Sequence, residues 1–232
     1  MSRSFSLVDS KVAETEFFLK KIDESERRMF DFKCYLSAFV SSSRSITFSL
    51  QSVLKNTEGF EVWYTKHQTK MKNDPLARFF NEFRRINQHI GENVVNRGTF
   101  GVNGPYLYWF IPSQEIKAVP ELDVSSACKE YFISVLELVY DCYRIFGTTI
   151  DAHQRYTSSY FRTIGKTIED AEVEAGFFAG WTDIGKPEFE EYRWQMVRDQ
   201  MPGCEINEIF YQYLNKITHA PERLPPFELK PT

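Results

Sequence analysis

Apolar residues recur every three or four positions along most of the chain, which predicts a succession of amphipathic helices. The first five predicted helices span about residues 10–28, 29–56, 60–72, 75–90 and 124–146. Asp74 and Pro75 suit the N-cap and the first position of the fourth helix, and Gly147 suits the end of the fifth. The pattern therefore predicts a mainly all-α protein.

Three small residues, Ser37, Ser41 and Ser45, recur every four positions on the second predicted helix. Residues at this spacing share one face of a helix. Because their side chains are small, we expect another helix to approach this face closely.

The helical spacing is lost between residues 93 and 112, where valine and aromatic residues favour strand. Asn103-Gly104-Pro105 supplies a turn, so we expect a small inserted β-hairpin. Beyond residue 147, weaker patterns predict further helices at about 150–164, 168–178, 187–201 and 205–217. We expect a helical bundle over residues 1–147, with the hairpin inserted at about 93–112, and a helical extension over 148–232 packed on it as a single domain.

The 232 residues carry a formal net charge of -4. This charge gives no general attraction to a nucleic-acid backbone, so a nucleic-acid role would need a local basic patch. No segment approaches the ~18 consecutive apolar residues of a membrane span, and the N-terminus lacks the apolar core of a signal peptide. We therefore expect a cytoplasmic protein with no membrane partner.

The residues that usually bind metals show no ligand pattern. The four cysteines form no CxxC pair and the four histidines have no ligand spacing, so we expect buried reduced thiols, no metal and no cofactor. An acidic cluster, Glu169, Asp170, Glu172 and Glu174, is either a metal site or a solvated face. The solvated face is favoured because no histidine or second carboxylate helix accompanies the cluster.

The segment Arg84-Arg85-Ile86-Asn87-Gln88-His89, near the end of the fourth predicted helix, is the one candidate for chemistry. It combines a cation with a histidine, which can act as a general base near neutral pH. On a helical wheel Arg85 lies one turn before His89, whereas Arg84 lies about 140° from it. The alternative is that His89 only interacts with the exposed carbonyls at the helix end.

This arginine and histidine, separated by four residues at the end of a capped helix, resemble the signature of the HEPN superfamily. In that superfamily the histidine follows the arginine by four to six residues, and the resemblance covers roughly residues 10–146. It implies an antiparallel helical bundle that acts as a metal-independent ribonuclease, with the motifs of a homodimer facing a shared cleft. It assigns Arg84 and His89 as catalytic residues, with Arg85 and Asn87 in support.

Two more arginines, Arg44 and Arg78, are candidates for RNA binding in the same cleft, and their alternative is a surface ion pair or a solvated face. Asn87 either orients His89 or satisfies a buried backbone group. The hairpin aromatics either stack nucleobases or pack on the bundle. These aromatics are Tyr106, Tyr108 and Trp109.

The resemblance implies an endoribonuclease of stress response, a toxin–antitoxin pair or phage defence. Its expected partners are a second copy of the chain, RNA, and an antitoxin or other protein. Because a fold does not determine a function, the alternative is a non-catalytic helical module that binds a protein through the same face.

Overall fold

The computed structural model describes residues 4–89, 94–95, 98–100, 104, 106–218, 221 and 223–224, with the side chains of residues 88 and 89 outside the description. Within these residues the chain is mainly helical, and its one sheet has two short strands. The predicted all-α class is therefore confirmed. The chain forms two compact units, one of residues 1–139 with 208–215 and one of residues 140–207 with 216–232.

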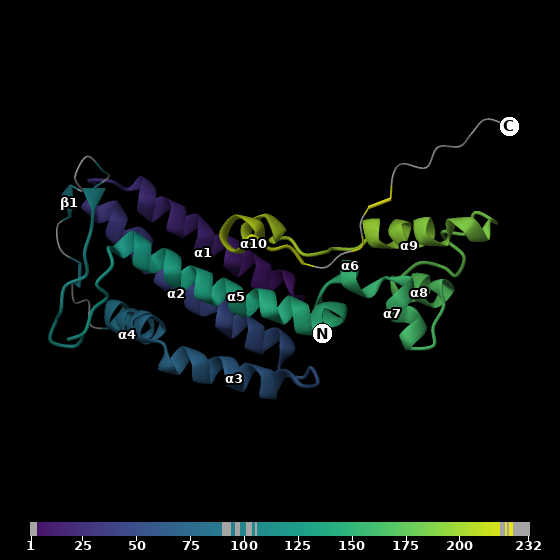
Figure 1. The fold of residues 1–232 in the computed structure, drawn as a ribbon, viewed down its shortest axis with the longest axis horizontal. Helices are drawn as coiled ribbons and strands as arrows, with labels where there is room; N and C mark the ends of the chain where they lie inside the picture. Colours follow the sequence, from purple (N-terminus) through teal and green to yellow (C-terminus); the bar gives the residue numbers. More distant parts are fainter. Residues whose placement is uncertain are drawn as a thin grey trace. The chain divides into compact units, whose positions relative to one another are not determined.

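The first unit is a bundle of long helices that alternate in direction (Figure 1). Its helices agree with the predicted ones to within a few residues at most ends. They are α1 (Ser6–Glu24), α2 (Met29–Leu54), α3 (Phe60–Asn73), α4 (Pro75–His89), the first part of α5 (Val124–Ile150), and α10 (Asn207–Leu214). Figure 1 shows α3 and α4 following one another along the flank of α2, so that together they take the place of one long helix.

The break between α3 and α4 follows from Asp74 and Pro75. A residue before proline is disfavoured in the helical region, and Asp74 is extended, with φ -78° and ψ 121°. Its carboxylate accepts the backbone N–H groups of Leu76 at 2.8 Å and Ala77 at 3.0 Å. The predicted N-cap is confirmed, and the same residue both ends α3 and begins α4.

Replacing Asp74 by alanine should lower the free energy of unfolding by about 1 kcal/mol, because two N–H groups of α4 lose their acceptor. Asp74→Asn keeps an acceptor oxygen and should retain most of that stability. Urea denaturation followed by circular dichroism measures both. If the asparagine variant is as unstable as the alanine variant, the charge of Asp74 matters and the capping bond does not.

Aromatic side chains of α4 form the centre of the first unit's core. Phe80 is 1% exposed and stacks on Tyr131 of α5, with the ring centroids 4.6 Å apart. Phe80 also meets Phe39 of α2 edge to face at 6.1 Å. The buried residues of α4 recur at helical spacing, as predicted for an amphipathic helix, and orient its polar residues away from the core. They are Ala77, Phe79, Phe80, Phe83 and Ile86.

The predicted hairpin is present as two short antiparallel strands, β1 (Thr99–Phe100) and β2 (Tyr106–Leu107). Of the predicted turn, Asn103 and Pro105 lie outside the described residues. Tyr108 is 3% exposed and stacks on Phe32 of α2 at 3.8 Å, so this aromatic packs on the bundle.

The second unit has a core of its own, to which short helices contribute. They are α6 (Ala152–Arg155), α7 (Ser158–Thr163), α8 (Ile168–Glu174), the 3-10 turn η1 (Pro187–Phe189) and α9 (Glu190–Asp199). Trp194 and Phe161 are central to this core, with ring centroids 5.2 Å apart. The single helix predicted over 150–164 is wrong, because Asp151 and Thr157 each accept a backbone N–H and start separate helices.

The prediction that Gly147 ends α5 is also wrong, since the helix continues to Ile150. A Cβ at Gly147 would lie 1.9 Å from Oε1 of Gln154. The glycine therefore leaves room for the Gln154 side chain and does not end the helix. In the described part of the chain, every helix falls short of the length or apolarity that a membrane span requires.

Candidate functional site

A polar seam runs between α2 and α4. Nδ2 of Asn87 donates a hydrogen bond of 2.6 Å to Oγ of Ser37. The hydroxyl of Ser41 donates to the carbonyl of Ser37, and the hydroxyl of Ser45 donates to the carbonyl of Ser41, both at 2.9 Å. Both hydroxyls are therefore bonded within α2. α4 therefore contacts this serine face at Ser37, and the close approach of a helix along Ser41 and Ser45 stays a prediction. Asn87 itself bonds to a side chain, which neither of its two predicted roles included.

Arg84 lies on the same seam, one turn before Asn87. Because α2 and α4 are antiparallel, Arg84 is level with Ser41. The side chain is half-buried, and its Nε is fully buried without a hydrogen-bond acceptor among the described residues. Leaving a buried donor of a charged group unsatisfied costs about 1–3 kcal/mol or more. Such a group in a native fold calls for an anion or a water molecule as partner.

Arg85, the neighbouring residue, points the other way and is exposed. Its Nε and Nη2 donate to Oε1 of Glu82 at 2.9 and 2.5 Å, and Nη2 also donates to Oε2 of Glu115 at 3.2 Å. The hydrogen bonds that Arg85 donates to Glu82 and then to Glu115 raise the pKa of Arg85 above its ordinary value. Two carboxylates thus neutralise Arg85, which leaves Arg84 as the unsatisfied guanidinium of the motif.

His89 is the last residue of α4, but its side chain lies outside the described residues. Its position in the chain nevertheless places its backbone five residues, or about 7.5 Å along the axis, beyond Arg84. The backbone therefore locates His89 at the end of the seam.

The two predicted RNA-binding arginines, Arg44 of α2 and Arg78 of α4, line one cavity of about 180 Å³. The cavity lies where α3 gives way to α4, and Tyr131 of α5 also lines it. We call it the junction cavity, and no carboxylate is found among the described residues that line it. These residues are Arg44, Tyr64, Gln68, Met71, Lys72, Ala77, Arg78, Asn81 and Tyr131.

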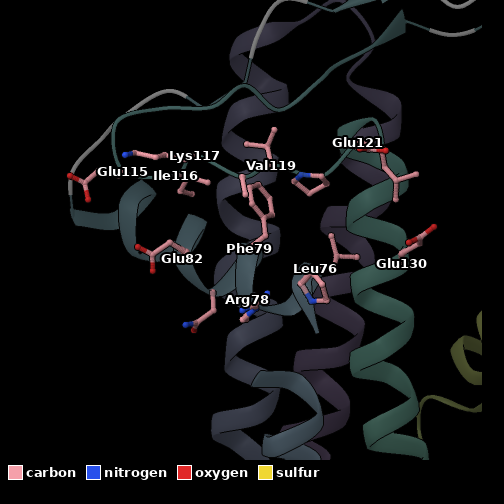
Figure 2. Close-up of a pocket in the computed structure, with 15 residues that line it drawn as sticks. Leu76, Arg78, Phe79, Glu82, Glu115, Ile116, Lys117, Val119, Glu121 and Glu130 are labelled. Carbon is pink, nitrogen blue, oxygen red and sulfur yellow. The ribbon is translucent and has the colours of Figure 1, made fainter. Parts of the chain in front are cut away.

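A wider cavity of about 760 Å³ lies beside α4, between this helix and residues 115–122. Phe79 and Val119 lie at its centre in Figure 2, with carboxylates on either side. Four glutamates and two cations line it, so its charge is opposite to that of the junction cavity. The charged residues are Arg78, Glu82, Glu115, Lys117, Glu121 and Glu130.

Sequence reasoning missed most of the junction cavity. Tyr131 follows the apolar stripe of α5 and gives the appearance of an ordinary core residue. The available signal was its hydroxyl, since a buried tyrosine needs a polar partner. Nothing in the sequence pointed to Lys72 and Gln68 as cavity residues. They lie near residues of α4 only because the chain changes direction at Asp74.

Among the described residues, the acidic cluster does not bring three potential metal ligands together. The expected solvated face is nevertheless wrong for Glu172, which is fully buried. Its carboxylate accepts bonds from Thr182, Gly180 and Arg193. All four cysteines are thiols, as expected, but Cys34 is exposed and Cys204 is only partly buried.

A family model described as bacteriophage lambda protein ea47 matches residues 5–92. The match begins one residue before α1 and ends just beyond α4, so it includes the segment from Arg84 to His89. No curated protein and no solved structure matches the chain. Over its first four helices the chain is therefore similar to a bacteriophage protein.

Proposed function

We propose that the chain is a metal-independent endoribonuclease whose catalytic residues are Arg84 and His89. The observation that carries this proposal is the buried Nε of Arg84, which finds no acceptor in the part of the chain that the structure describes. A phosphate bound to the accessible part of this half-buried guanidinium would compensate its charge, and the partly buried setting would strengthen the interaction. The proposal also draws on the resemblance of this segment to the HEPN signature.

The chemistry requires only a base and a cation. The imidazole of His89 removes the proton from a ribose 2′-hydroxyl, and the resulting oxygen attacks the adjacent phosphorus. The guanidinium of Arg84 stabilises the negative charge that accumulates on the phosphate oxygens. The bond to the 5′-oxygen breaks as this oxygen accepts a proton from the imidazolium, which leaves a 2′,3′-cyclic phosphate and a 5′-hydroxyl.

The remaining residues of the motif have lesser roles. Asn87 is held by Ser37 and fixes the last turn of α4 against α2, so it positions the end of the helix that carries His89. Arg85 is neutralised by Glu82 and Glu115 and contributes little charge to the reaction. The homodimer in which the two α4 helices face each other belongs to the proposal, because the resemblance implies it.

The biological setting follows from the similarity to a bacteriophage protein family. Among stress response, toxin–antitoxin pairs and phage defence, this similarity favours a setting in which phage and host act on each other's RNA. An antitoxin or another protein partner would then control the nuclease.

The alternative function is a non-catalytic module that binds a protein. The wide cavity beside α4 favours it, because apolar residues such as Phe79, Ile116 and Val119 are surrounded there by carboxylates. A basic segment of a partner protein would match this combination. In that case Arg84 would serve only the packing of α4 on α2.

Incubating the full chain with RNA in excess EDTA tests the nuclease. We expect cleavage to continue in the chelator, because the proposed step uses side chains alone, and we expect products with 2′,3′-cyclic phosphate ends. Mass spectrometry of the fragments identifies these ends. Intact RNA after incubation with correctly folded protein would contradict the nuclease and favour the binding module.

A further inference from the structure

The junction cavity concentrates positive charge. Arg44, Lys72 and Arg78 reach it from three different helices, and its described lining includes no carboxylate. Among the described residues, none of the three forms an ion pair, whereas many other basic residues of the chain do. Three cations around so small a space repel one another unless an anion joins them.

The local partners of Arg44 leave its charge uncompensated. Its guanidinium lies over the ring of Phe48, 4.4 Å from the centroid, and donates a 3.3 Å bond to the hydroxyl of Thr47. Both partners are neutral. The acid closest in sequence to Lys72 is Asp74, whose carboxylate already accepts the N–H groups at the start of α4.

Tyr131 also lines the cavity, and its hydroxyl is a further hydrogen-bond donor. The residue is 6% exposed, and its hydroxyl forms no hydrogen bond with any described residue. Burial raises the pKa of Tyr131 to about 12, against the opposing effect of Arg44. The hydroxyl therefore stays protonated at neutral pH and can donate to a bound anion.

We propose that the junction cavity binds the phosphate of a phosphate monoester, which Arg44, Lys72 and Arg78 neutralise and to which the Tyr131 hydroxyl donates. A volume of about 180 Å³ has room for about six water molecules, enough for a phosphate and the start of its substituent. It is smaller than the ~300–1,000 Å³ of cavities that enclose a whole small-molecule ligand. The remainder of the ligand therefore lies outside.

A monoester fits better than the diester of a nucleic-acid backbone. A monoester carries nearly two negative charges at neutral pH and three acceptor oxygens, whereas a backbone diester carries one charge. Three cations and a hydroxyl donor match the larger charge and the larger number of acceptors. Such a group is found at a phosphorylated end of an RNA and in a free nucleotide.

This site does not depend on the proposed cleavage. Arg78 and Arg84 are six residues apart on α4, about 9 Å along its axis. A binding measurement with an RNA that lacks free 2′-hydroxyls can therefore test the cavity without any reaction at Arg84 and His89.

The test uses the full chain and a ten-nucleotide 2′-O-methyl RNA with a 3′ fluorophore, prepared with a 5′-phosphate and with a 5′-hydroxyl. Fluorescence anisotropy at constant salt should show that the phosphorylated form binds about tenfold more tightly. One charge-assisted hydrogen bond would account for a difference of this size. Calorimetry with adenosine monophosphate, adenosine and inorganic phosphate forms the second arm. If adenosine monophosphate binds as tightly as the oligomer, the ligand of the cavity is a free nucleotide. If it binds more weakly, the ligand is the phosphorylated end of an RNA.

The variants distinguish binding of the phosphate in the cavity from a general electrostatic attraction of the protein for RNA. Arg78→Gln, at the exposed rim, and Arg44→Gln should each remove most of the preference for the phosphate, and Tyr131→Phe should reduce it several-fold. Lys66→Gln removes the same charge from the far face of α3 and should change nothing. Equal binding of the two oligomers together with no heat from the free phosphates would overturn the proposal. An equal loss in Lys66→Gln and Arg78→Gln would overturn it too.

Discussion

His89→Ala is expected to slow RNA cleavage by about 10²–10⁴-fold, the usual contribution of a positioned general base. The reason is that His89 is the residue proposed to remove the 2′-hydroxyl proton, whereas the neighbouring Arg85 is held by Glu82 and Glu115. The measurement is the single-turnover cleavage rate of a labelled RNA in EDTA, with circular dichroism to confirm the fold.

Arg84→Ala should slow the same step by about 10²–10³-fold, because a charged donor to the developing phosphate charge is lost. Arg85→Gln should cost far less, since its guanidinium is already neutralised by two carboxylates. This comparison decides which arginine is catalytic. The helical wheel favours Arg85, because it is the neighbour of His89, whereas the burial of its guanidinium favours Arg84. A greater loss in Arg85→Gln would reverse the assignment.

His67→Ala is the matched control for these variants. His67 lies on α3, with its ring 4.6 Å from the ring of Trp63, and takes no part in the seam between α2 and α4. Its replacement should leave the cleavage rate unchanged. Cleavage that persists at the original rate in His89→Ala would remove the basis of the proposed reaction and leave the binding module.

The helices of the first unit could be predicted because local sequence determines them. Asp74 and Pro75 are neighbours in the chain and mark the start of α4 by their own backbone preferences. The apolar face of α4 likewise follows from its spacing alone. The short helices of the second unit could not be separated, because Asp151 and Thr157 interrupt a pattern whose apolar spacing continues through them.

The sites depend on contacts that the chain does not show locally. Arg44 and Arg78 could each be named as candidates from the sequence, but their meeting in one cavity depends on how α2 and α4 pair. The same limit applies to Arg84, because its position about 140° from His89 on the helical wheel does not show whether its side chain is buried. Burial depends on the neighbouring helices, which the sequence of α4 alone does not reveal.

Glu172 illustrates the same limit in the second unit and has the largest expected effect on stability. Its neighbours in sequence are acidic, which suggests a solvated face, but Glu172 is fully buried. Its Oε1 accepts the N–H of Thr182 at 2.8 Å, and its Oε2 accepts the N–H of Gly180 at 2.5 Å. Nη2 of Arg193 donates to Oε1 at 3.4 Å. One side chain thus holds the loop after α8 and links it to α9.

Glu172→Gln should lower the free energy of unfolding of the second unit by about 3 kcal/mol. The amide nitrogen of glutamine faces the N–H of Gly180 or Thr182, so a buried donor loses its acceptor and Arg193 loses a charge partner. Glu169→Gln is the matched control, because Glu169 binds the same Arg193 at 2.8 Å but is partly exposed. An exposed pair contributes less than about 1 kcal/mol.

Tryptophan fluorescence during urea denaturation reports on the second unit if Trp63 and Trp109 are first replaced by phenylalanine, which leaves Trp181 and Trp194. Equal midpoints for Glu172→Gln and Glu169→Gln would show that the buried carboxylate does not hold the loop. A lower midpoint for Glu172→Gln alone is the expected result.

The stability that Glu172 provides should also depend on pH. Burial raises the pKa of Glu172, but the bonds from Thr182 and Gly180 and the charge of Arg193 outweigh it, so the pKa lies below its ordinary value of 4.5. Folding therefore favours the ionised form, and the stabilisation is complete above the unfolded pKa and is lost as the pH falls through the folded one. The second unit of the natural chain should lose stability on acidification below about pH 4.5, whereas Glu172→Gln should lose less over the same range. Parallel pH profiles of the two proteins would show that the carboxylate of Glu172 is not the group that titrates.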